Sequence, residues 1–103
     1  MSSRLEKLQH SLNSNPNDPF TRYLVALEHA KLDQAENAIE YFKTLVEKHP
    51  AYVPTYYQYA QLLEKLGRVP EAAGLYRAGI KAARAEGNTH AASELQLALD
   101  MIE

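Results

Sequence analysis

The sequence contains no cysteine, which excludes disulfide bonds, thiolate metal sites and thiol nucleophiles. No apolar run approaches the roughly 20 residues that a membrane-spanning helix needs, and residues 1–12 lack the features of a secretory signal. Basic residues are not in excess, since 11 Lys and Arg stand against 13 Asp and Glu, for a net charge of −2. Nucleic-acid-binding proteins usually carry a basic stripe. We therefore predict a cytoplasmic protein that binds neither membranes nor nucleic acids.

Motifs for catalysis and metal binding are also missing. There is no Gly-x-Ser-x-Gly turn and no Gly-rich phosphate loop. No two histidines have the i, i+4 spacing that places two metal ligands on one helical face; they are His10, His29, His49 and His90. Glu36 and Glu40 are interpreted as helix-surface charges that pair with Lys43, rather than as an acid–base pair. We predict no enzymatic activity, no metal and no cofactor.

What the sequence does contain is a repeat with a period of 34 residues. Its 103 residues, 46% of them hydrophobic, are enough for one domain with a core. Similar residues recur at this offset without gaps, as in Pro16 and Pro50, Ala26 and Ala60, Ala38 and Ala72, and Phe42 and Tyr76. Such a period is typical of repeat proteins, whose units stack on their neighbours and present a surface.

Helix-start signals divide the first half of the chain. Each combines a capping residue with a residue that favours the first turn: Ser3 with Glu6, Asp18 with Pro19, and Asp33 with Glu36. The first helix is expected to end near Asn13, the second near Leu32 and the third before Pro50.

The second half predicts three more helices. Pro54 begins the first of them, and Gly67 ends it in the left-handed conformation. Pro70 begins the next, which stops at Gly87. Asn88 or Thr89 caps the last helix, whose expected buried stripe comprises Ala91, Ala92, Leu95, Ala98, Leu99 and Ile102. Because no segment alternates like a strand, the predicted fold class is all-α, with about six helices.

Two units share an order of residue types. The second contains Tyr56, Tyr59-Ala60, Leu63, Leu66-Gly67, Ala72 and Tyr76; the first contains Val25-Ala26, His29, Leu32-Asp33, Ala38, Phe42 and a closing Pro50. This order resembles the tetratricopeptide repeat. The resemblance implies a short right-handed superhelical α-solenoid of antiparallel helix pairs. Within a single domain, 1–103, it implies a half-repeat helix at 3–14, repeats at 18–52 and 53–87, and a capping helix at 88–103.

Three positions depart from the family pattern or carry a packing requirement. Arg22 stands where Tyr56 supplies an aromatic ring, so we expect weaker outer packing there, or cover by the N-terminal helix. His29 stands where the family often has tyrosine and is assigned a packing role. Gly79 is expected to allow close approach of the C-terminal helix.

The resemblance also implies a concave face that holds a peptide or a partner's helix. The residues expected there are Tyr23, Leu27, Lys31, Tyr57, Gln58, Gln61, Glu64 and Lys65, together with Ala30. Tyr23 and Tyr57 are the predicted hot spots, unless they are packed against the capping helices. The carboxylate clamp of chaperone-adaptor relatives is absent, because its slots hold Tyr23, Leu27, Gln58, Asn88 and Ala92. We predict a non-catalytic adaptor that binds a peptide or protein segment.

Two further surfaces offer alternatives. Leu97 and Met101 lie off the buried stripe of the last helix, and could make the chain a structural unit that forms homodimers. Arg77, Lys81 and Arg84 form a basic ridge that could meet an acidic partner or phosphate. We favour the simpler interpretation that this ridge offsets the helix dipole and solvates the outer face.

Overall fold

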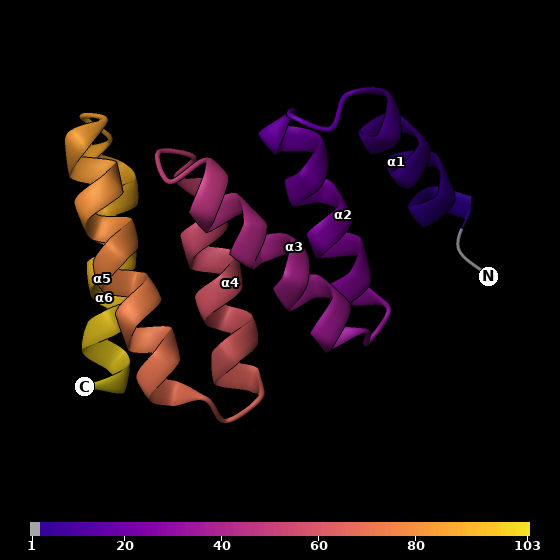
Figure 1. Ribbon diagram of the computed structural model, residues 1–103. Helices are drawn as coiled ribbons and strands as arrows, with labels where there is room; N and C mark the ends of the chain where they lie inside the picture. Colours follow the sequence, from indigo (N-terminus) through magenta and orange to yellow (C-terminus); the bar gives the residue numbers. More distant parts are fainter. Residues whose placement is uncertain (1–2) are drawn as a thin grey trace. The chain divides into compact units, whose positions relative to one another are not determined.

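The structure, a computed structural model, describes the backbone of residues 3–103 and the side chains of residues 4–103 (Figure 1). Six helices make up this part of the chain, and it contains no strand: α1 (Ser3–Ser14), α2 (Pro19–Lys31), α3 (Ala35–Lys48), α4 (Pro54–Lys65), α5 (Val69–Ala85) and α6 (Thr89–Ile102). The all-α prediction is confirmed. The capping side chain predicted at Ser3 lies outside the described residues.

The helices form two compact units, divided between His49 and Pro50. In the N-terminal unit, α2 packs against both α1 and α3. Its core is built from one face of each helix and contains Leu12, Val25, Ala26, Ala38, Ile39, Phe42 and Leu45. Amphipathic helices of this length gain most of their stability from such packing rather than from intrinsic propensity.

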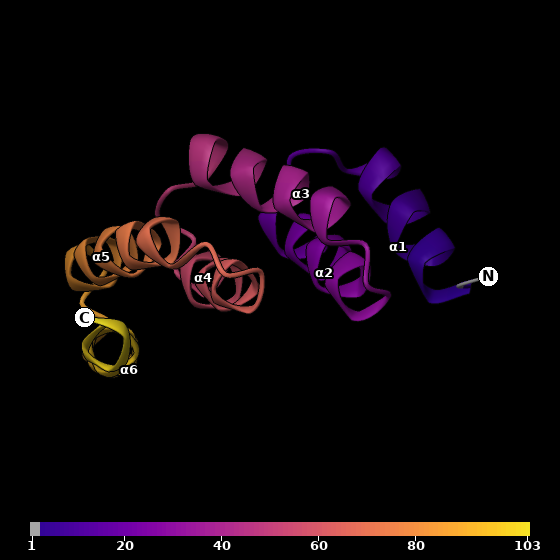
Figure 2. The same ribbon diagram turned by 90° about the horizontal axis from the view of Figure 1, so that it is seen from below.

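In the C-terminal unit, α5 packs against both α4 and α6. Figure 1 shows that α4 and α5 run antiparallel, and Figure 2, which views α6 nearly end-on, shows α6 next to α5. The core includes Tyr56, Tyr59, Leu63, Tyr76, Ile80, Leu95 and Leu99. Of the stripe predicted on α6, Ala92, Leu95, Ala98 and Leu99 are buried, whereas Ala91 and Ile102 are half-buried.

Small residues lie at the helix contacts. The four alanines that recur with the 34-residue period, Ala26, Ala38, Ala60 and Ala72, are fully buried in the helix pairs α2–α3 and α4–α5. A Cβ atom on Gly79 would lie 2.6 Å from the Cβ of Tyr56 and 3.1 Å from the Cδ1 of Leu95. Gly79 therefore allows close approach of α6, as predicted, and an even closer approach of α4.

The helix ends follow most of the predicted signals. Gly67 and Gly87 have φ angles of 78° and 71°, in the left-handed region that ends a helix. The Asp18 side chain accepts a hydrogen bond from the backbone N–H of Phe20 at 3.3 Å, and the Asn88 side chain accepts one from Ala91 at 3.0 Å. Asn88 and Thr89 were the two candidates for the N-cap of the last helix, and Asn88 is the N-cap residue.

The capping box predicted at Asp33 and Glu36 is wrong. Helix α3 begins at Ala35, its N-cap residue is Gln34, and no side chain caps it. Asp33 has a φ angle of 62° and occupies the position that Gly67 holds in the second unit. The next backbone N–H, that of Gln34, bonds the carbonyl of His29 at 2.8 Å. Since Asp33 ends α2 in the left-handed conformation, it cannot also adopt the extended conformation of an N-cap residue.

Candidate partner-binding surface

Tyr76 connects the core of the C-terminal unit to the exposed side of α4. This residue of α5 is fully buried. Its hydroxyl accepts a hydrogen bond from the Gln61 side-chain amide at 2.7 Å and donates one to the Glu64 carboxylate. The Gln61 amide also lies 3.5 Å from Glu64 Oε2. Two predicted partner-binding residues are thus held by one core side chain.

The electrostatics keep this hydroxyl protonated. Burial raises the pKa of Tyr76 well above its usual value near 10, and the bond donated to the Glu64 carboxylate raises this pKa further. The bond from Gln61 lowers the pKa of Tyr76, but by less. Tyr76 therefore remains a hydrogen-bond donor throughout the physiological pH range.

Tyr57 lies one helical turn before Gln61, on the same side of α4. Its ring packs edge-to-face on Tyr76, with ring centroids 6.1 Å apart and planes at 67°. The residue remains 38% exposed. The contact restricts the Tyr57 side chain and leaves part of it accessible, which suits a residue that makes contact with a partner.

A hollow of about 480 Å³ lies next to these residues, and helices α4 and α6 line it. Its lining consists of Tyr57, Gln61 and Glu64 from α4 and Glu94, Leu97, Ala98 and Met101 from α6. A second hollow, of about 250 Å³, shares Tyr57 and Glu94 with the first and extends to Pro54, Asn88 and His90. We call these two hollows together the α4–α6 groove. It brings Leu97 and Met101, predicted to form a separate self-association surface, to the same place as Tyr57.

Two charged side chains line the larger hollow, and both are carboxylates. Glu64 is half-buried, whereas the Glu94 side chain is 59% exposed, and His90 Nε2 lies 3.7 Å from Glu94 Oε2. No lysine or arginine is among the described residues that line either hollow. Gln58 and Lys65, the other residues predicted on α4, are exposed and lie outside this lining.

The residues predicted on α2 belong to the N-terminal unit. Tyr23 and Leu27 are half-buried, and Lys31 is exposed. Their neighbour His29 is 6% exposed, and its ring stacks on that of Tyr41 with centroids 5.3 Å apart. His29 Nδ1 also bonds the Gln34 side chain at 2.7 Å. The packing role predicted for His29 is confirmed.

Arg22 takes the place of the missing aromatic residue in this unit. Its guanidinium lies over the Tyr41 ring, 5.7 Å from the ring centroid, and donates a hydrogen bond to the Pro16 carbonyl at 3.1 Å. The Tyr41 hydroxyl in turn accepts a bond of 2.8 Å from the Gln9 side chain of α1. At this position, predicted to be either weakly packed or covered by the N-terminal helix, Arg22 is held by the cation–π contact and the bond to Pro16, and α1 contacts Tyr41 through Gln9.

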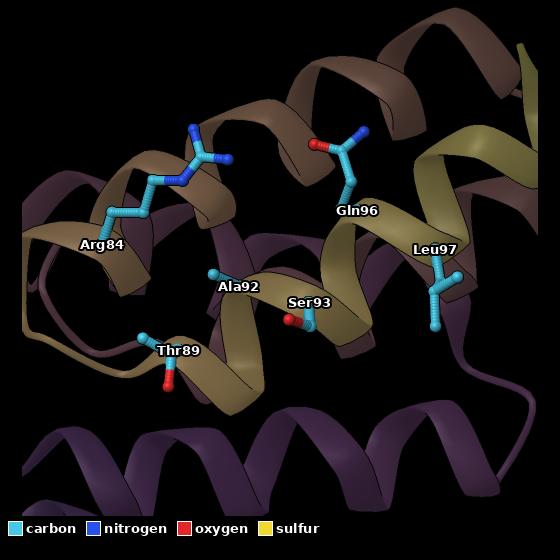
Figure 3. A pocket seen from close by; sticks show the side chains of 6 residues that line it. All are labelled: Arg84, Thr89, Ala92, Ser93, Gln96 and Leu97. Carbon is cyan, nitrogen blue, oxygen red and sulfur yellow. The ribbon is translucent and has the colours of Figure 1, made fainter.

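A different surface lies between α5 and α6. A hollow of about 520 Å³ there is lined by the side chains shown in Figure 3, namely Arg84, Thr89, Ala92, Ser93, Gln96 and Leu97. An adjacent hollow of about 350 Å³ adds Arg77 and Lys81. Arg77 forms an ion pair with the Glu103 side chain. The predicted basic ridge thus lines these two hollows, and none of its residues lines the α4–α6 groove.

The described residues contain no group of three or more His, Cys, Asp or Glu side chains that could hold a metal ion. None of the helices α1 to α6 is long and apolar enough to cross a membrane.

Comparisons with known proteins relate the sequence and the fold to one family. A family model described as tetratricopeptide repeat matches residues 29–98. A tetratricopeptide repeat domain protein from Salinibacter ruber shares 47% sequence identity with this chain. Its solution structure matches with a TM-score of 0.83, and the match covers 86% of this chain and 90% of that one. A crystal structure of such a protein from Salinibacter ruber is 46% identical, with a TM-score of 0.78 over 84% and 96% of the two chains.

The fold likeness extends to a more distant protein. The solution structure of a protein from Bordetella parapertussis has a TM-score of 0.82 over 99% of this chain and 89% of that one, at 20% identity. This similarity concerns the fold alone. A comparison with curated protein sequences found no match.

Proposed function

Since this chain belongs to the tetratricopeptide repeat family, we propose that it is a non-catalytic adaptor that binds a peptide or protein segment of a partner. Domains of this family generally bind proteins and generally lack catalytic activity. The proposed repeats are residues 18–52 and 53–87, flanked by the half-repeat helix at 3–14 and the capping helix at 88–103. A cytoplasmic location stays a prediction.

The α4–α6 groove is the observation that supports this proposal most. Its two hollows, of about 480 and 250 Å³, share Tyr57 and Glu94 and are therefore adjacent. Tyr57 combines an exposed surface with a ring held against Tyr76. A tyrosine so restrained contributes a large contact area while losing little conformational entropy on binding, which is the usual property of a hot-spot residue.

The remaining predicted residues are expected to contribute less to binding than Tyr57. Tyr23, Leu27 and Lys31 on α2, and Gln58 and Lys65 on α4, stay predicted contact residues outside the groove lining. We expect their replacement to weaken binding less than the replacement of Tyr57. The reason is that hot spots cluster in well-packed hollows, whereas residues at the rim contribute little.

Affinity capture followed by direct binding tests this function. Partners captured by the full chain are identified by mass spectrometry, and synthetic peptides that tile their sequences are titrated against the purified protein. We expect Tyr57→Ala to weaken binding of the positive peptides by at least about 10-fold, as expected for a hot spot. Phe20→Ala is the matched control, because Phe20 is an aromatic residue of α2 that is 55% exposed. Equal binding by both variants would contradict the proposal.

The second candidate function is self-association. Its supporting observation is that Leu97 and Met101 are 66% and 86% exposed, the largest values among the exposed large apolar residues. Burying both in a dimer would remove apolar surface from water. Light scattering over a concentration series tests this candidate: a constant monomer mass, unchanged by Leu97→Ser with Met101→Ser, would rule it out.

A further inference from the structure

We propose that the α4–α6 groove selects a segment that carries a lysine or arginine flanked by apolar residues. The cationic side chain lies between Glu64 and Glu94, next to the Tyr57 ring, and its apolar neighbours contact Leu97 and Met101. This inference rests on the proposed function and names the class of partner. An acidic segment, or one held by its terminal carboxylate, is disfavoured at this groove.

Charge is distributed unevenly over the surface of the C-terminal unit. The described lining of the larger hollow contains Glu64 and Glu94 and no cationic residue. Arg77, Lys81 and Arg84 line the hollows between α5 and α6 instead. Like charges opposite one another across an interface disfavour binding, whereas opposite charges favour it. The groove is therefore complementary to a cation.

Glu64 is held in position before any partner arrives. The Tyr76 hydroxyl and the Gln61 amide both contact Glu64 Oε2. Within the described part of the chain, Glu64 Oε1 makes no hydrogen bond. Because the carboxylate is already ordered, an ion pair with Oε1 loses less side-chain entropy than one between two freely moving chains.

Aromatic and apolar side chains lie beside the two carboxylates. Tyr57 shares the hollow with both of them and retains 38% of its surface. A cation over the face of a tyrosine ring is stabilised by the ring's quadrupole, and arginine makes this contact most often. Leu97, Ala98 and Met101 form the apolar part of the lining. Methionine is flexible, so Met101 can adapt to apolar side chains of different shapes.

The test uses two capped synthetic peptides and the full chain. They are acetyl-Ser-Leu-Ala-Arg-Leu-Ser-amide and the same peptide with glutamate in place of arginine. Binding is followed by ¹H–¹⁵N NMR titration, which locates the perturbed residues. We expect the arginine peptide to shift the amides of α4 and α6 around Tyr57 and Leu97, and to bind at least about 10-fold more tightly than the glutamate peptide. Raising the salt concentration should weaken its binding.

Matched variants separate charge from shape. Glu64→Gln and Glu94→Gln remove one charge each and keep the size of the side chain. Each substitution should therefore lower the affinity for the arginine peptide by about 3- to 10-fold. The control is Glu86→Gln, since Glu86 is exposed, follows α5 and lies outside the groove lining. This control changes the net charge equally and should leave the affinity unchanged.

The outcomes distinguish this inference from the proposed function. If the two peptides bind equally and Tyr57→Ala weakens both, the groove binds peptides but the preference for a cation is wrong. If neither peptide perturbs the groove at about millimolar concentration, the inference is overturned as well. The proposed function fails separately, if Tyr57→Ala leaves the binding of captured partners unchanged.

Discussion

The Tyr76 hydroxyl donates a hydrogen bond to the Glu64 carboxylate, so a fully buried residue of α5 orients a charged residue of α4. The same hydroxyl accepts a bond from Gln61 at 2.7 Å, and the Tyr76 ring supports Tyr57. Three predicted partner-binding residues thus depend on one core side chain.

Tyr76→Phe should preserve the fold and make the Gln61 and Glu64 side chains more mobile. The ring still fills the core, while the Gln61 amide and the Glu64 carboxylate lose a shared partner. Both of these groups can turn to water, so we expect a loss of about 1 kcal/mol in the free energy of unfolding, measured by urea denaturation. Binding of groove ligands should weaken because Glu64 becomes mobile. An unchanged affinity would show that this hydrogen bond serves stability alone.

Alkaline pH should destabilise the protein through Tyr76. Its pKa is raised in the folded state by burial and by the bond to Glu64, relative to a value near 10 in the unfolded chain. A raised folded-state pKa means that this stabilisation is fully present below pH 10. It is lost as the pH rises from there through the folded-state pKa, because the unfolded chain deprotonates first. The free energy of unfolding, measured between about pH 9 and 11.5, should fall less steeply for Tyr76→Phe.

Two glycines of α5 should respond in opposite directions to the same substitution. A Cβ atom on Gly79 would lie 2.6 Å from the Tyr56 Cβ, so Gly79→Ala forces the helices apart and should cost about 1–3 kcal/mol. At Gly74 the added Cβ would meet no described atom within 4 Å beyond the chain neighbours of Gly74 and the adjacent backbone of α5. Gly74→Ala should therefore stabilise the helix by up to about 1 kcal/mol. Thermal and urea unfolding of both variants check this contrast, and a loss of stability in both would contradict it.

The end of α2 offers a stabilising substitution. Asp33 has a φ angle of 62°, which is unfavourable for a residue with a Cβ atom, and its charge lies near the negative end of the α2 dipole. We expect Asp33→Gly to raise the free energy of unfolding by about 0.5–1 kcal/mol. Asp33→Ala removes the charge and keeps the Cβ atom. If the free energy of unfolding rises equally in both variants, the loss of the charge explains the stabilisation and the backbone conformation does not.

The cap of α6 should matter for stability and for the groove. Asn88 accepts the hydrogen bond from the Ala91 backbone at 3.0 Å, and Asn88→Ala should cost about 1 kcal/mol. Hydrogen exchange should increase first in the initial turn of α6, which carries His90 and Ala91 at one end of the groove. Asn88→Asp is the control, because aspartate caps equally well. Loss of stability in both variants would show that the cap is not the cause.

Capping residues, prolines, glycines and the spacing of apolar residues predict the six helices and most of their ends. These features depend on interactions that are local in the sequence, such as side-chain caps, left-handed glycines and the 3.6-residue spacing of apolar residues. Ala26, Ala38, Ala60 and Ala72, which recur with the 34-residue period, are fully buried where α2 meets α3 and α4 meets α5. The error at Asp33 has a local origin as well. Its side chain suits either an N-cap or a left-handed helix end, and the end of α2 decides between them.

The grouping of the predicted surface residues depends on how the helices pack. Helical spacing alone places Leu97 and Met101 on one face of the last helix, away from its buried stripe. Spacing does not specify which other helix that face adjoins, because this depends on how α5 positions both α4 and α6. Packing across α5 places Leu97, Met101 and Glu94 around the same hollow as Tyr57 and Glu64. Helix formation is encoded locally, whereas a groove arises from contacts between residues distant in the sequence.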